Sequence, residues 1–124
     1  MNRNLALKIV LGVVGVLFVA LIYPLIGFLI AREDPARSMM ISLYVTLGVF
    51  LLLAIRNPSA SRSLIAFTAW SSFAHAAVMS IQALQHLILR RELVGVAVLV
   101  VIGVVLLALA PAKQPTEKGV LQAN

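Results

Sequence analysis

The stretch Leu93–Ala110 reads LVGVAVLVVIGVVLLALA, an uncharged run of 18 residues that is followed by Pro111. Val, Leu and Ile supply 13 of the 18 residues, and each favours insertion by about 0.3–0.6 kcal/mol near the bilayer centre. A helix of roughly 17–25 apolar residues crosses the hydrocarbon core of a membrane. The stretch therefore predicts a transmembrane helix.

Three more uncharged runs precede this one, at residues 9–31, 39–55 and 63–89, with basic residues close to both ends of each. The first run exceeds the roughly 7–15 apolar residues of a signal peptide. The segment Val98–Ile102 does not alternate apolar and polar residues, as a membrane β-strand would. We predict an all-α membrane protein with four transmembrane helices, at about 9–31, 39–55, 63–89 and 93–110.

The polar connections between these runs are short, so consecutive helices must be antiparallel neighbours. This predicts an up-down-up-down antiparallel bundle in a single domain, residues 1–110. Residues 111–124 are polar and contain two prolines and a glycine, which predicts a flexible C-terminal tail.

The composition supports the membrane assignment, because 62% of the residues are apolar and only 11% are charged. A typical soluble domain carries about 25% charged residues, and disordered chains are poor in Leu, Ile and Val. The net charge of +6 comes from basic residues in ones and twos between apolar runs. They lie where interfacial anchors are expected, so the predicted partner is the lipid bilayer and not nucleic acid.

The distribution of Lys and Arg predicts the orientation. With the N-terminus inside the cell, six basic residues lie on the inner side and four on the outer side. The positive-inside rule then favours cytoplasmic N- and C-termini.

The third run carries most of the polar residues of the spans. At about 100° per residue, the following side chains share one arc with Met79 and His86: Thr68, Ser71, Ser72, His75 and Gln82. Because polar groups facing lipid are costly, this stripe is expected to face protein or a wet cavity. It is the candidate intramembrane site.

His75 is the one side chain with a near-neutral intrinsic pKa deep in a span. Three roles remain open: a structural hydrogen bond to Ser71, Ser42 or Tyr44, a contact to a ligand or cofactor, and a proton relay. His75 and His86 are 11 residues apart, about 16 Å along a helix. They cannot both ligate one haem iron within a monomer.

Catalytic and metal-binding patterns are missing from the sequence. No carboxylate lies within a span, no cysteine is present, and the histidines match no metal-ligand spacing. Neither a G-x-S-x-G nor an S-x-x-K motif accompanies the serines. We therefore expect no enzyme, no catalytic residue, no metal and no required cofactor.

Helix-packing signals lie in the first and third runs. Pro24 removes a backbone donor and predicts a kink in the first helix, which would either serve packing or open a cavity beside His75. Gly12 and Gly15 share one face of that helix. Ala69 and Ala76 belong to a small-residue face of the third, which predicts close contact with another helix or another copy.

The central region resembles a known family. The resemblance rests on Leu43–Ala54 (LYVTLGVFLLLA), Arg56-Asn57-Pro58 and Phe67–Ser72 (FTAWSS), followed by His75, Met79 and Gln82-Ala83-Leu84. These stretches resemble a family of small bacterial four-helix integral membrane proteins that is known only as a domain of unknown function. The resemblance implies a bacterial inner-membrane protein and no particular activity.

Two kinds of function fit these features. The first is a structural or accessory subunit of the inner membrane, associated with itself or with a larger membrane complex. The alternative is a membrane-embedded protein that binds haem, a quinone or a small solute, or an oligomeric transporter, through the polar face of the third helix.

Overall fold

The computed structural model describes residues 2–111, and within them every regular element is helical. The elements are α1 (Arg3–Ala20), α2 (Ile22–Ala31), α3 (Pro35–Ala54), η1 (Pro58–Ser61), α4 (Arg62–Leu84), η2 (Arg90–Glu92) and α5 (Leu93–Leu109). Four helical stretches are long and apolar enough to cross a membrane: Arg3–Ala31, Pro35–Ala54, Pro58–Leu84 and Arg90–Leu109. The prediction of an all-α protein with four membrane-spanning helices is confirmed.

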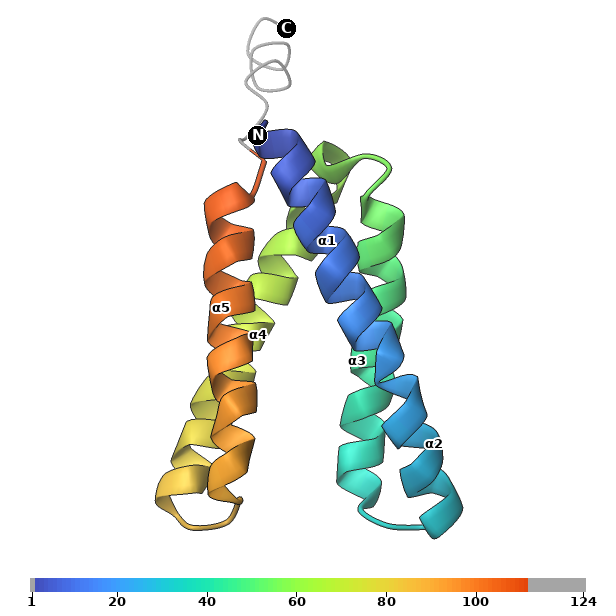
Figure 1. The fold of residues 1–124 in the computed structure, drawn as a ribbon, viewed down its shortest axis with the longest axis vertical. Helices are drawn as coiled ribbons and strands as arrows, with labels where there is room; N and C mark the ends of the chain where they lie inside the picture. The colour runs from blue at the N-terminus through green and yellow to red at the C-terminus, as the bar shows by residue number, and fades with distance from the viewer. Residues whose placement is uncertain (1, 112–124) are drawn as a thin grey trace, which may run out of the picture.

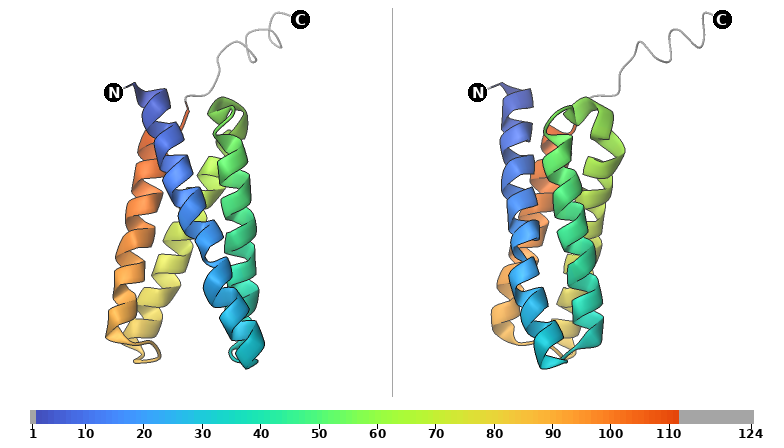
Figure 2. Two further views of the ribbon diagram at one scale, coloured as in Figure 1. Left: turned by 45° about the vertical axis from the view of Figure 1, so that its right-hand side comes forward. Right: turned by 90° about the vertical axis from the view of Figure 1, so that its right-hand side faces the viewer.

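The chain runs up and down through two helical hairpins (Figure 1). Helices α1 and α2 pack against α3 to form the first hairpin, and α4 packs against α5 to form the second. The hairpins approach each other where the N-terminus, η1 and the end of α5 lie, which we term the closed end. They diverge toward the α2–α3 and α4–α5 connections, the open end, which the left view of Figure 2 also shows.

The buried core lies toward the closed end and draws on both hairpins. Contacts between the hairpins are made chiefly by α1 against α5. The core side chains are Leu7, Leu11, Val14, Phe18, Leu51, Ala54, Ile65, Ala69, Ile102 and Leu106. Helix α2, near the open end, buries no residue at all.

In each hairpin, a glycine lets the two helices pack closely together. A Cβ atom on Gly48 would lie 2.8 Å from the Gly15 carbonyl oxygen, so these two glycines let the backbones of α1 and α3 touch. A Cβ atom on Gly103 would lie 2.5 Å from the ring of Phe73, which packs α5 onto α4. Such small-residue contacts bring membrane helices together where lipid provides no hydrophobic driving force.

The first membrane-spanning stretch is interrupted at Leu21, between α1 and α2. Pro24 has no N–H, so it cannot donate the helical hydrogen bond to the carbonyl group of Ala20, four residues before it. At the interruption, the Leu21 N–H donates to the Phe18 carbonyl, three residues before it, at 3.2 Å. The interruption separates α1, which packs on both α3 and α5, from α2, which packs along α3.

Helix α4 ends at Leu84, whereas the uncharged run continues to Leu89. His86 adopts a left-handed conformation with φ 59°. The His86 N–H bonds to the Ala83 carbonyl and the Leu87 N–H to the Gln82 carbonyl, which is a Schellman termination. His86 is therefore exposed beyond the helix and does not extend the polar stripe, contrary to expectation.

Two arginine side chains donate hydrogen bonds to the backbone at the C-terminal end of α5. The Arg3 Nη2 atom donates to the carbonyl oxygens of Ala108 and Ala110, both at 3.0 Å, and Arg62 Nε donates to that of Pro111 at 2.8 Å. These bonds satisfy carbonyl groups that a helix end leaves unpaired. The tail predicted at residues 111–124 lies, apart from Pro111, outside the described residues.

Candidate functional site

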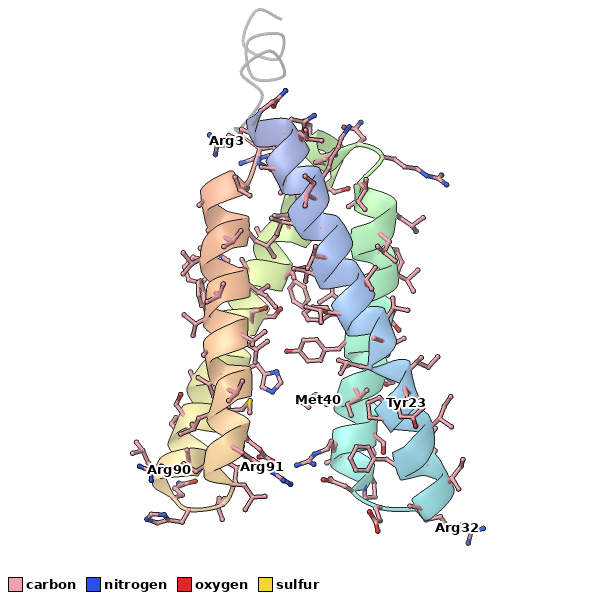
Figure 3. The ribbon with its side chains drawn as sticks, in the orientation of Figure 1. Arg3, Tyr23, Arg32, Met40, Arg90 and Arg91 are labelled. Carbon is pink, nitrogen blue, oxygen red and sulfur yellow. The ribbon has the colours of Figure 1, made fainter. Side chains whose placement is uncertain are left out.

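A cleft of about 650 Å³ lies between the two hairpins on the side of the open end. Most of its wall is apolar, and the side-chain view shows Met40 on the face of α3 that is turned toward the second hairpin (Figure 3). The first hairpin contributes Leu17, Phe18, Leu21, Asp34, Ala36, Arg37, Met40, Ile41 and Tyr44, and the second contributes His75, Val78, Met79, Gln82, Ile88, Glu92, Gly95, Val98, Leu99 and Ile102.

The inner end of the cleft is formed by three rings. The Tyr44 hydroxyl and His75 Nδ1 are 2.6 Å apart, which joins α3 of one hairpin to α4 of the other. Phe18 packs on Tyr44 in an edge-to-face arrangement, with ring centroids 5.1 Å apart. Within residues 2–111, this is the one hydrogen bond that joins two side chains. Of the three partners that the sequence left open for His75, the structure selects Tyr44.

The Tyr44–His75 pair leaves hydrogen-bonding capacity unused. If the hydroxyl donates to Nδ1 of a neutral imidazole, His75 keeps an Nε2–H donor and the phenol oxygen keeps an acceptor site. If Nδ1–H donates instead, the hydroxyl is the free donor and Nε2 is the free acceptor. Either tautomer gives the pair one free donor and one free acceptor.

Charged groups lie at the outer end of the cleft. Arg37 forms an ion pair with Asp34 at 3.2 Å on its own hairpin and approaches Glu92 of the other hairpin at 3.8 Å. Its guanidinium also lies over the ring of Phe28, 5.7 Å from the centroid. The cleft thus runs from a neutral polar inner end to a charged mouth with two carboxylates and one guanidinium.

The predicted polar stripe is divided between three environments. His75 and Gln82 line the cleft. Thr68 and Ser72 are fully buried, and their hydroxyls donate to the carbonyls of Leu64 and Thr68, at 2.8 and 2.7 Å. These two residues satisfy their polar atoms within α4, as hydroxyls in membrane helices commonly do, and offer nothing to a ligand.

Ser71 lies in a separate groove of about 400 Å³ between α3 and α4. Its hydroxyl donates to the Thr68 carbonyl at 3.1 Å. Tyr44 lines both this groove and the cleft. The Tyr44–His75 pair therefore belongs to the wall between the two spaces.

A third space, the α1–α5 groove, adjoins the cleft. It measures about 460 Å³, and every side chain in its wall is aliphatic. Leu17, Val98 and Ile102 line both the groove and the cleft. The groove extends along α1 from Ile9 to Leu17, a helical rise of about 12 Å.

Arg37 was not expected in the candidate site, and Tyr44 only as a possible partner of His75, although the sequence carries a signal for both. Arg37 and Tyr44 are two helical turns apart on α3, and His75 and Gln82 have the same spacing on α4. Because α3 and α4 are antiparallel, Tyr44 lies at the same depth along the helices as His75, and Arg37 lies at the same depth as Gln82. Phe18 reaches the cleft from α1, and no comparable spacing in the sequence predicts its contact with Tyr44.

Within the part of the chain that the structure describes, no three His, Asp or Glu side chains are grouped to hold a metal ion. The cleft wall supplies one histidine and, far from it along the helices, the carboxylates of Asp34 and Glu92. The arrangement is suited to hydrogen bonding and to apolar contact.

Comparison with known protein families identifies the family of this chain. The chain belongs to DUF6632, a family of unknown function. The family match covers residues 3–122, and so extends beyond the central region to the first and last helices. No curated protein and no solved structure shows a significant match to the chain.

Proposed function

We propose that this membrane protein binds a lipid-soluble small molecule in the cleft between its hairpins. The observation that carries the proposal is the combination of a 650 Å³, mainly apolar cleft with the unused donor and acceptor of Tyr44 and His75 at its inner end. Ligand sites in proteins typically measure about 300–1,000 Å³ and place a few polar groups in an apolar wall. The proposal includes no catalytic step, since the carboxylates of the cleft wall, those of Asp34 and Glu92, lie with Arg37 at its outer end.

The size of the cleft favours a small molecule over a partner helix. The cleft follows α3 from Asp34 to Tyr44, a helical rise of about 15 Å. A helix that spans the membrane is about 30 Å long, so the cleft covers only about half of its length.

We also propose that the closed end faces the cytoplasm of a bacterial inner membrane. Six basic residues of the sequence lie on the closed-end side of the spans, Arg3, Lys8, Arg56, Arg62 and, after α5, Lys113 and Lys118, and four lie at the open end, Arg32, Arg37, Arg90 and Arg91. The positive-inside rule counts Lys and Arg, and the difference of six to four supports this orientation. The orientation makes the cleft accessible from the outer half of the bilayer.

Native mass spectrometry of protein purified in mild detergent tests the binding function. Gly95 lines the cleft, and a Cβ atom there would meet only the terminal methyl of Met79, at 3.7 Å. Gly95→Phe should therefore fill the cleft without disturbing the helix backbones. Gly27→Phe is the matched control, because a Cβ atom on Gly27 meets nothing within 4 Å.

The wild type and Gly27→Phe should carry a bound small molecule that Gly95→Phe lacks. Equal small-molecule content in all three proteins, or none in the wild type, would contradict the proposal. An absorption spectrum of the same samples tests haem as the bound species, since haem gives a Soret band.

An accessory subunit, alone or as a homo-oligomer, is the second candidate. It is favoured by α2, which fully buries none of its residues within the chain and thus offers the face turned away from α3 to a partner. Crosslinking in native membranes from cysteines introduced at Ile26 and Leu29, which are 50% and 60% exposed, tests this role. Specific crosslinks to one protein would support it, and crosslinks to none would exclude α2 as the contact.

A further inference from the structure

Resting on the proposed binding function, we infer that the ligand is an amphipathic lipid with a neutral, planar, oxygen-bearing ring and an apolar tail, the chemistry of a quinone or quinol. The ring lies at the inner end of the cleft beside Tyr44 and His75. The tail lies in the α1–α5 groove.

The hydrogen-bonding groups at the inner end match such a head. The Tyr44–His75 pair offers one donor and one acceptor in either tautomer, as the 2.6 Å contact requires. A carbonyl oxygen uses the donor, and a hydroxyl group can use both. The pair therefore accepts oxidised and reduced forms of the same ring without a change of protein structure.

The walls at this point favour a flat ring. Phe18 and Tyr44 pack edge to face at 5.1 Å, and the rings of Tyr44 and His75 lie 5.3 Å apart at 44°. Met40 and Met79 line the same cleft. Aromatic edges and thioether sulfur both interact favourably with aromatic rings.

Charge in the cleft disfavours an anionic head. Its wall contains one guanidinium, that of Arg37, against the carboxylates of Asp34 and Glu92. Both carboxylates lie within 4 Å of that guanidinium. No cationic side chain lines the inner end beside His75. A fatty-acid carboxylate at this depth would thus lack a counter-ion.

The position of the α1–α5 groove accounts for the tail. It joins the cleft at Leu17, Val98 and Ile102 and has a wholly aliphatic wall. A ligand with its ring beside His75 can therefore extend its tail past Val98 into the groove. Val98 is 46% exposed, so this route opens toward lipid.

The test measures the partition of four probes with ten-carbon tails into lipid nanodiscs with and without the full chain. The probes are decylubiquinone, decylbenzene, decanol and decanoate. Decylubiquinone should bind about tenfold more tightly than decylbenzene, the difference expected from one net hydrogen bond. Decanoate should bind most weakly.

Two pairs of variants test the two halves of the site. Because either residue can hold the free donor, the double variant Tyr44→Phe with His75→Ala should lower decylubiquinone affinity about tenfold and leave decylbenzene unchanged. Tyr23→Phe, at a tyrosine that is 85% exposed on α2, should change neither. Val98→Trp should weaken both probes by blocking the junction. Val100→Trp, on a face of α5 that lines neither space, is its control.

The outcomes separate this inference from the binding function. Equal binding of all four heads, still sensitive to Val98→Trp, would overturn the quinone assignment and leave the binding function intact. The same conclusion would follow if none of the probes bound but native mass spectrometry found another molecule lost in Gly95→Phe. If no probe binds and the wild type carries nothing, both proposals fail.

Discussion

The closed and open ends of this molecule are built from the same two hairpins, yet they differ in how their contacts are made. At the closed end, aliphatic side chains from both hairpins are fully buried, among them Leu11, Leu51 and Leu106. At the open end, the hairpins are joined by the Tyr44–His75 hydrogen bond and by the longer Arg37–Glu92 contact. Close packing defines one end, and a few polar contacts across a cleft define the other.

This difference implies that the closed end provides the stability of the fold and that the open end provides the binding site. Packing between helices is the main source of stability inside a membrane, because lipid is as apolar as the side chains it replaces. The closed end holds that packing, so the open end can keep a cleft with incompletely paired polar groups. Substitutions at the closed end should therefore destabilise the fold, and substitutions at the open end should affect binding with little loss of stability.

The largest effect is expected at the Gly15–Gly48 contact. In Gly48→Ala, the new methyl group would lie 2.8 Å from the Gly15 carbonyl oxygen and 2.9 Å from the Val19 nitrogen, both backbone atoms that cannot move alone. The free energy of unfolding should fall by about 2–3 kcal/mol. Equilibrium unfolding in mixed micelles measures this loss, and Gly27→Ala, with open space around its Cβ, should be neutral.

The next effect is expected in the closed-end core. Leu11→Ala removes a side chain with 0% exposure and leaves a cavity. The free energy of unfolding should fall by about 2 kcal/mol, at the low end of values for soluble cores, because the transfer from water does not contribute in lipid. The same measurement on Leu29→Ala, where the side chain is 60% exposed, should show no loss. Equal losses at both positions would refute the assignment of the core.

A smaller effect is expected for the hydrogen bond between the hairpins. Tyr44→Phe and His75→Ala should each reduce stability by about 1 kcal/mol, and a double-mutant cycle should give a coupling of about 0.5–1.5 kcal/mol. A coupling near zero would show that the 2.6 Å contact contributes nothing to joining the hairpins. The Tyr23→Phe variant serves as the control for loss of a phenol hydroxyl.

The smallest effect is expected at the mouth of the cleft. The Arg37–Glu92 contact is 3.8 Å long and its side chains are 43% and 28% exposed, so screening by water and ions weakens it. Glu92→Gln should change the free energy of unfolding by less than about 0.5 kcal/mol. A loss above 1 kcal/mol in mixed micelles would mean that this ion pair holds the open end together.

The sequence predicts the helices well because their signals are local. Uncharged length and flanking basic residues identify all four spans, and the position of Pro24 accounts for the interruption at Leu21. The end of α4 is harder to predict from the sequence, because the run to Leu89 stays uncharged and the left-handed conformation of His86 ends the helix. A histidine in that conformation has no strong sequence signature.

The candidate site is only partly predictable for a different reason. A helical wheel groups Thr68, Ser72, His75 and Gln82 on one side of α4, but it cannot show which part of that side another helix covers. Packing buries Thr68 and Ser72 toward the closed end, while the divergence of the hairpins leaves His75 and Gln82 beside the cleft. That divergence depends on contacts between distant helices, chiefly α1 with α5.

The central claim is that the hairpins are joined at one end and separated at the other by a ligand-binding cleft. Pulsed electron spin resonance tests it most directly, because the chain contains no cysteine and takes spin labels only at introduced sites. The account predicts a longer distance between labels at Arg32 and Arg91, at the open end, than between labels at Asn4 and Ala108, at the closed end. Similar distances for both pairs, as in a uniformly packed bundle, would contradict it.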